Sequence, residues 1–123
     1  MKELTKAEEH VMQALWSLEK GFLKDIVDHH PEPTPAYTTV STVVSVLVKK
    51  GVIGFNTYGK TREYFPTVSK TQYSRFSIKG LIRKFFDDSP SQFASFFTKD
   101  ENITTDELES IQMLINQEIE KRK

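Results

Sequence analysis

The sequence predicts a mainly helical protein with one small β-hairpin, followed by a C-terminal helical segment. Apolar residues recur at helical spacing from residue 4 to residue 18. Residues 52–67 form two short strand-like runs around a glycine, and three helix start signals follow residue 68. A chain of 123 residues can bury one modest core and carry a small appendage.

Composition excludes several classes of protein. Cysteine is absent, which excludes disulfides and thiolate metal sites. No apolar run approaches the roughly 18 residues that a membrane span needs, and the first residues lack the apolar core of a signal peptide. We therefore expect a cytoplasmic protein without membrane insertion.

The charge is zero overall but unevenly distributed. Residues 49–86 hold nine basic side chains against Glu63 alone, for a net charge of +8. The preceding residues carry a net charge of −3 and the following residues −5. A basic stripe of this kind is the electrostatic footprint of nucleic-acid binding. The alternative interpretation is a solvated surface whose charges pair with the acidic C-terminal part.

The first element is predicted to be an amphipathic helix. Thr5 and Glu8 have the spacing of a capping box, and Gly21 ends the pattern. Its apolar residues recur three and four positions apart: Leu4, Ala7, Val11, Leu15 and Leu18.

The second element is predicted to be a short helix that Pro31 ends. Residues 31–35 contain three prolines and predict a stiff connector without regular structure. The residues expected on one stripe of the short helix are Phe22, Leu23, Ile26, Val27 and His30.

Residues 40–48 are rich in β-branched side chains and could form a strand. Strict alternation fails, however, and helical spacing fits better, with Lys49, Lys50 and Gly51 as a typical helix end. We therefore predict a third helix. One side is expected to be apolar, comprising Tyr37, Val40, Val44, Leu47 and Val48, and the other polar, comprising Thr38, Thr39, Ser41, Thr42, Ser45 and Lys49.

The hairpin is expected to turn at residues 58–60, where Gly59 supplies the flexible position, and to end at Pro66. Three helices should follow, because Ser69–Gln72, Ser89–Gln92 and Thr104–Glu107 are each a cap pair. Six of the nine phenylalanines lie between residues 76 and 97, and short helices this aromatic cannot bury themselves alone. They could pack on the first domain or on a second copy of the chain. Because C₂ homodimers are the commonest assemblies, we favour the second outcome.

Three helices followed by a hairpin is the winged-helix order. The third helix of that fold enters the major groove of DNA, and the hairpin contacts the flanking backbone. Residues 1–68 are therefore predicted to form a winged-helix DNA-binding domain, and residues 69–123 a helical dimerisation segment. The expected DNA-binding residues are Thr38, Thr39, Ser41, Thr42, Ser45, Lys49, Lys60 and Arg62. The expected dimerisation residues are Tyr73, Phe76, Leu81, Phe85, Phe93, Phe97, Leu108, Ile111, Ile115 and Ile119.

No pattern indicates catalysis or a cofactor. The three histidines have no carboxylate at a spacing typical of a zinc site, and no nucleophile elbow, phosphate loop or dinucleotide fingerprint occurs. We therefore expect no metal, no cofactor and no enzymatic activity.

Four segments resemble the penicillinase-repressor (BlaI/MecI/CopY) family. Residues 4–16, LTKAEEHVMQALW, look like its opening helix, and residues 39–51, TVSTVVSVLVKKG, like its recognition helix. Residues 59–66, GKTREYFP, resemble its wing, and residues 68–73, VSKTQY, the start of its dimer helix. The match covers nearly the whole chain in order.

The resemblance implies a homodimeric winged-helix repressor that binds palindromic operators in double-stranded DNA, upstream of resistance or metal-homeostasis genes. It also implies a membrane sensor protease as partner, since the β-lactam branch is inactivated by signalled cleavage of the dimerisation segment. The chain departs from the family pattern at three places. Val46 replaces a basic residue of the recognition helix, Phe96–Phe97 replaces the Asn–Phe cleavage bond, and the C-terminal cysteines of the copper-responsive branch are missing.

Two hypotheses about function follow. The first is a dimeric, operator-binding repressor. The second is a winged-helix module for protein–protein interaction without DNA binding, which the zero net charge and the apolar Val46 favour. Salt-sensitive DNA binding discriminates between them, because only the first hypothesis predicts it.

Overall fold

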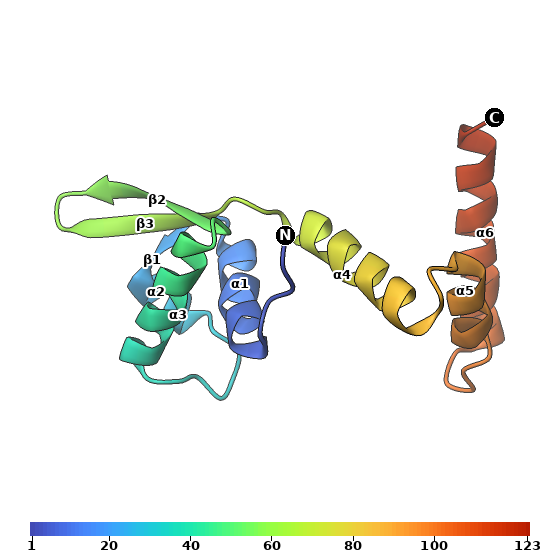
Figure 1. Cartoon of the computed structure of the whole chain (residues 1–123), viewed down its shortest axis with the longest axis horizontal. Coiled ribbons are helices and arrows are strands. Elements are labelled where there is room, and N and C mark those ends of the chain that lie inside the picture. The colour runs from blue at the N-terminus through green and yellow to red at the C-terminus, as the bar shows by residue number, and fades with distance from the viewer. The chain divides into compact units, whose positions relative to one another are not determined.

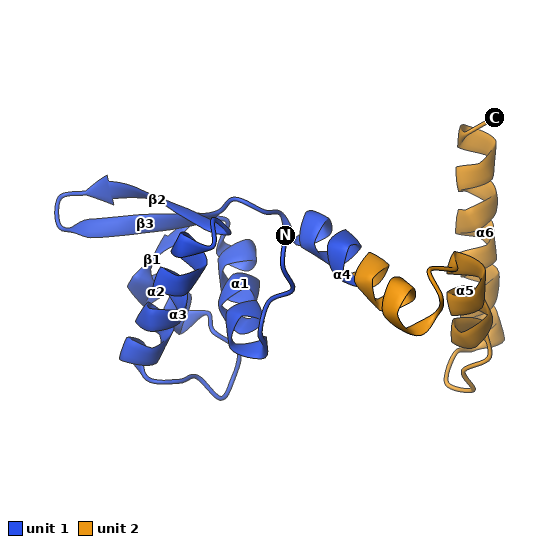
Figure 2. Ribbon diagram, in the orientation of Figure 1, with its two compact units in different colours: residues 1–77 blue, residues 78–123 orange.

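The computed structural model describes all 123 residues, and they divide into two compact units. Unit 1 comprises residues 1–77 and unit 2 residues 78–123, so that the division falls inside one helix (Figure 2). No helix in either unit is both long and apolar enough to cross a membrane.

Unit 1 has the predicted winged-helix order with one additional strand. Its elements are α1 (Lys6–Leu18), β1 (Gly21–Phe22), α2 (Leu23–Asp28), α3 (Tyr37–Lys49), β2 (Ile53–Tyr58) and β3 (Thr61–Pro66). The strands form an antiparallel sheet in the order β1-β3-β2, and the β2–β3 hairpin extends beyond the helices (Figure 1). We call this hairpin the wing.

The predicted capping signal of α1 and the predicted third helix are both present. Thr5 caps α1 and exchanges hydrogen bonds with Glu8 in a complete capping box. The predicted third helix is confirmed as α3, and Val40, Val44 and Leu47 on its inner side are each at most 1% exposed. These side chains bury α3 against α1, which fixes the direction of its outer face.

The prediction for residues 21–30 was partly wrong. Phe22 was expected inside the second helix, but it lies in β1, where Gly21 pairs with Tyr64 of β3. A strand of two residues has no period of its own, and only pairing with a distant strand defines it. The helix α2 starts at Leu23 and ends at Asp28, before the predicted end at Pro31.

The core of unit 1 joins α1, α2, α3 and the base of the wing. Trp16 packs against it and donates a hydrogen bond from Nε1 to the Val68 carbonyl at 2.8 Å. The buried apolar residues are Leu4, Val11, Met12, Ala14, Leu15, Ile26, Val40, Val44, Leu47, Val52, Ile53 and Tyr73.

One partly buried ion pair links α1 to the end of α3. The Lys50 ammonium lies 2.7 Å from the Glu8 carboxylate, whose residue is only 5% exposed. Burial raises the pKa of the Glu8 carboxyl, but Lys50 and the hydrogen bonds with Thr5 outweigh it and hold the pKa below its ordinary value of 4.5. Lys50 is therefore a structural cation of unit 1.

Replacing Lys50 with alanine is expected to destabilise unit 1 by about 1–2 kcal/mol at pH 7, a modest loss because the Lys50 side chain is 40% exposed. Since the folded pKa of Glu8 is lowered, this stabilisation is complete above the ordinary value of 4.5 and is lost as the pH falls through the folded pKa. Urea unfolding at a series of pH values measures the difference. The exposed neighbour Lys49 supplies the matched control, Lys49→Ala. A difference that persists at pH 2 would show that Lys50 stabilises something other than the Glu8 carboxylate.

The helix α4 (Lys70–Phe85) starts in unit 1 and ends in unit 2. Unit 2 also contains α5 (Pro90–Thr98) and α6 (Thr105–Lys121). All three predicted start signals are confirmed, because Ser69, Ser89 and Thr104 accept hydrogen bonds from the amides of Gln72, Gln92 and Glu107. A phenylalanine cluster lies within unit 2, with ring centroids 5.4–5.9 Å apart: Phe86, Phe93, Phe96 and Phe97. No residue of α5 or α6 is buried.

Candidate nucleic-acid interface

The outer face of α3 carries the predicted hydroxyl residues. Thr38, Thr39, Thr42 and Ser45 are exposed, and Ser41 is half-buried on the side toward the wing. Tyr37 was expected on the apolar side, but its side chain is 53% exposed. It occupies the first turn of α3, beyond the reach of the core that buries Val40 one turn later.

The start of α3 has no side-chain cap. Its N-cap residue is Ala36, which offers no acceptor to the first amides, and no acidic residue lies in the first turn. Uncapped amides at a helix start carry partial positive charge and favour anions such as phosphate. The local sequence therefore leaves this end of the helix electropositive.

The wing places two cations beside α3. Gly59 has a φ of 62°, a left-handed conformation that suits a tight hairpin turn, and Lys60 follows it. Arg62 lies in β3 opposite Thr57 of β2. Its guanidinium sits over the Phe55 ring, 4.2 Å from the ring centroid, and this cation–π contact restricts where the charge can lie.

An open hollow of about 590 Å³ lies between α3, the start of α2 and the wing. We call it the α3–wing groove. Its lining contains three cations and no carboxylate, and it combines hydroxyl groups with aromatic rings. The lining residues are Phe22, Leu23, Lys24, Tyr37, Ser41, Ser45, Lys60, Thr61, Arg62 and Tyr64.

The groove brings together four of the eight residues that the sequence predicted for DNA binding: Ser41, Ser45, Lys60 and Arg62. Thr38, Thr39, Thr42 and Lys49 lie outside its lining, on the exposed surface of α3. Sequence reasoning missed Lys24 and Tyr37. A lysine in a short helix has no distinctive pattern, and only the packing of α2 beside α3 places it in the groove.

The predicted dimerisation residues fall into two groups. Tyr73 is 6% exposed within unit 1, where its hydroxyl accepts a hydrogen bond from the Leu4 amide and donates one to the Glu9 carboxylate. Phe76 packs partly against the same core. The remaining residues lie in unit 2, half-buried or exposed: Leu81, Phe85, Phe93, Phe97, Leu108, Ile111, Ile115 and Ile119.

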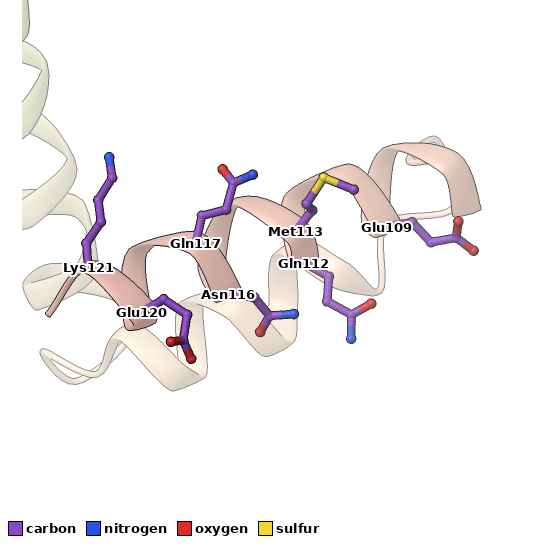
Figure 3. A pocket seen from close by; sticks show the side chains of 7 residues that line it. All are labelled: Glu109, Gln112, Met113, Asn116, Gln117, Glu120 and Lys121. Carbon is purple, nitrogen blue, oxygen red and sulfur yellow. The ribbon is translucent and has the colours of Figure 1, made fainter. Parts of the chain in front are cut away.

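A second hollow lies on α6 alone, on the side of the helix that carries Met113 (Figure 3). Its surroundings are mostly amides and charged groups, and Met113 is 62% exposed among them. The lining residues are Glu109, Gln112, Met113, Asn116, Gln117, Glu120 and Lys121. No cluster of three histidines or acidic residues suitable for a metal ion occurs anywhere in the chain.

Comparison with known proteins gives consistent results. The chain is 23% identical over 115 residues to the methicillin resistance regulatory protein MecI of Staphylococcus aureus (strain N315), covering 93% of this chain and 94% of the relative. It is 16% identical over 122 residues to the penicillinase repressor of Bacillus licheniformis, covering 98% and 95%.

Among solved structures, the DNA-binding domain of the repressor BlaI is similar to this chain, with a TM-score of 0.51 and 22% identity. The similarity covers 58% of this chain and 88% of the BlaI domain. This likeness confirms the winged-helix fold. The family model described as penicillinase repressor matches residues 4–117, nearly the whole chain. The chain therefore belongs to the penicillinase repressor family.

Proposed function

We propose that the protein is a transcriptional repressor that binds a palindromic operator in double-stranded DNA as a homodimer. The observation that carries this proposal is the α3–wing groove. It places Lys24, Lys60 and Arg62 beside the hydroxyl-rich face of α3 without an intervening carboxylate. Membership of the penicillinase repressor family supports repression as the outcome of binding.

In this proposal the two kinds of side chain have different tasks. Lys24, Lys60 and Arg62 neutralise backbone phosphates, which holds the protein in register but carries little sequence information. The exposed side chains of α3 contact base edges in the major groove. The names of the relatives, a penicillinase repressor and a methicillin resistance regulator, support β-lactam resistance genes as the targets.

The homodimer is proposed to form through unit 2. Its helices leave large apolar side chains in contact with water, including Phe85 at 68%, Phe96 at 70% and Leu114 at 64% exposure. Exposed apolar surface of this extent is typical of protein–protein interfaces. A second copy of the chain is the proposed occupant, because two linked winged helices match the two half-sites of a palindrome. Tyr73 is left out of the interface because its own unit buries it.

A membrane sensor protease pathway is the proposed regulator. The resemblance aligns the family's cleavage bond with the bond between Phe96 and Phe97 in α5, whose side chains are 70% and 39% exposed. Cleavage there would separate α6 from the rest of unit 2 and weaken the proposed dimer.

The test is binding of the purified protein to the DNA immediately upstream of its own gene, with a scrambled duplex as control. We expect tight, sequence-dependent binding at near-physiological salt, with two protomers on each site. The proposal would be contradicted if the protein bound every candidate promoter duplex as weakly as the scrambled duplex. It would favour instead a module that binds a protein partner.

Replacing Arg62 with alanine is expected to weaken binding to operator and scrambled DNA by the same factor. If Arg62 neutralises one phosphate, the slope of log affinity against log salt should fall by about 0.9. Fluorescence anisotropy at four or five salt concentrations measures this slope. Lys6→Ala removes one positive charge from the same unit outside the groove, so it should leave the slope unchanged. Equal slopes for wild type and Arg62→Ala would remove Arg62 from the interface.

A further inference from the structure

An apolar side chain occupies the outer face of α3. Val46 is 38% exposed, although the core-facing residues Val44 and Leu47 on the same helix are at most 1% exposed. Thr42 precedes Val46 by four positions, so the two side chains are neighbours on the same face. Packing inside unit 1 therefore does not explain the choice of valine.

The hydroxyl of Thr42 is already engaged. It donates a hydrogen bond to the Thr38 carbonyl at 3.0 Å, one turn earlier in the helix. Its hydrogen is therefore not free for a base, and its methyl group and oxygen lone pairs remain for an outside partner. Thr42 and Val46 together present methyl groups one helical turn apart.

The rest of α3 offers no conventional base reader. The helix sequence YTTVSTVVSVLVK contains no arginine, asparagine or glutamine, the residues that recognise guanine or adenine with paired hydrogen bonds. Its single charged residue, Lys49, lies in the last turn and suits a phosphate. Sequence discrimination by this helix must then rest on hydroxyl groups and on apolar contact.

We propose that Val46 is a specificity-determining residue which, with Thr42, recognises thymine through its C5-methyl group in the major groove. This inference rests on the proposed operator binding and specifies what the operator contains. Thymine is the base that displays a methyl group in that groove. Residues four apart in a helix are separated by about 6 Å along its axis. Each half-site should therefore present thymine methyls about two base-pair steps apart.

Charge complementarity supports duplex DNA as the occupant of this face. Lys49 lies one turn beyond Val46 on α3, and Lys24, Lys60 and Arg62 lie in the adjoining groove. Cations that flank an apolar strip match a groove whose methyl-bearing floor lies between two phosphate backbones. Double-stranded RNA does not fit, because its major groove is too deep and narrow for a helix to enter.

The experiment replaces thymines of the identified operator, one at a time, with deoxyuridine. This change removes only the C5-methyl group and keeps base pairing. We expect wild-type affinity to fall about three- to fivefold at one or two positions in each half-site, the loss typical of one buried methyl group. Other thymines should be insensitive.

Val46→Ala completes a double-mutant cycle with the sensitive duplex. The variant should bind the thymine operator three- to fivefold more weakly, as expected for lost methyl contacts. It should lose little further affinity when deoxyuridine replaces the sensitive thymine, because the two changes remove the same contact. Lys49→Ala is the matched control, since it should weaken both duplexes equally. Thermal unfolding verifies that the variants are folded.

Two results would overturn the inference in distinguishable ways. If wild-type protein binds its operator tightly but tolerates deoxyuridine at every position, operator binding stands and Val46 does not recognise thymine methyls. If the wild type fails to distinguish operator from scrambled DNA, the proposed function itself fails. The inference fails with it.

Discussion

Replacing Ile115 with lysine is expected to convert the proposed dimer into a monomer and to weaken binding to the proposed operator on the order of 100-fold, because the second half-site contact is then lost. Ile115 is 55% exposed on α6 although it belongs to an apolar stripe. Its companions on the stripe recur at helical spacing: Leu108, Ile111 and Ile119.

The expected loss of dimerisation follows from the desolvation of the lysine charge. In the proposed dimer the partner covers Ile115, so that a lysine there would lose its water without gaining a counter-ion. In a monomer the same lysine remains hydrated and costs little. The substitution therefore acts on association and leaves the winged-helix unit folded.

Met113 provides the matched control for this substitution. It is 62% exposed on the same helix, and the two-residue offset from Ile115 places it on the opposite face, among amides and charged groups (Figure 3). Met113→Lys should stay dimeric. Sedimentation at micromolar concentration distinguishes the two states. An Ile115→Lys variant that remains dimeric would move the interface away from this stripe.

Replacing Leu47 with alanine is expected to lower the free energy of unfolding of unit 1 by about 3 kcal/mol, within the usual range for a buried leucine. Leu47 is fully buried in the core that joins α1 and α3. The shortened side chain would leave a cavity that the helices cannot close without shifting. Operator binding should also fall at temperatures where the variant begins to unfold.

The adjacent residue supplies the control. Val46→Ala removes a side chain from the outer face of the same helix and should change stability by about 0.5 kcal/mol or less. Urea or thermal unfolding followed by circular dichroism measures both variants. Leu47→Ala should thus lose stability, whereas Val46→Ala should lose operator discrimination. Equal stability losses at the two positions would contradict the packing of α3 described here.

Local patterns predicted most of the helices of this protein. Thr5 with Glu8, Ser69 with Gln72 and Thr104 with Glu107 all make the expected cap hydrogen bonds. A cap pair spans four residues, and its geometry depends little on the rest of the fold. The inner face of α3 was also predictable, because Val40, Val44 and Leu47 recur with the period of the helix.

The candidate site was predictable only in part. Ser41, Ser45, Lys60 and Arg62 were expected from the winged-helix order, and they line one groove. Lys24 and the exposed Tyr37 were not expected, since α2 is too short to show a pattern and Tyr37 lies at a helical angle typical of the core. The absence of a cap at Ala36 becomes meaningful only once α3 is known to start there.

The sequence by itself determined the type and approximate bounds of the helices, the hairpin and the family resemblance, because each rests on neighbours within a few residues or on an ordered set of motifs. Tertiary structure alone decided the pairing of Gly21 with Tyr64, the ion pair of Glu8 with Lys50 and the hydrogen bond from the Leu4 amide to the Tyr73 hydroxyl. These partners lie more than 40 residues apart in the chain. No local period records such contacts, since they exist only after the core has brought α1, α3 and the sheet together.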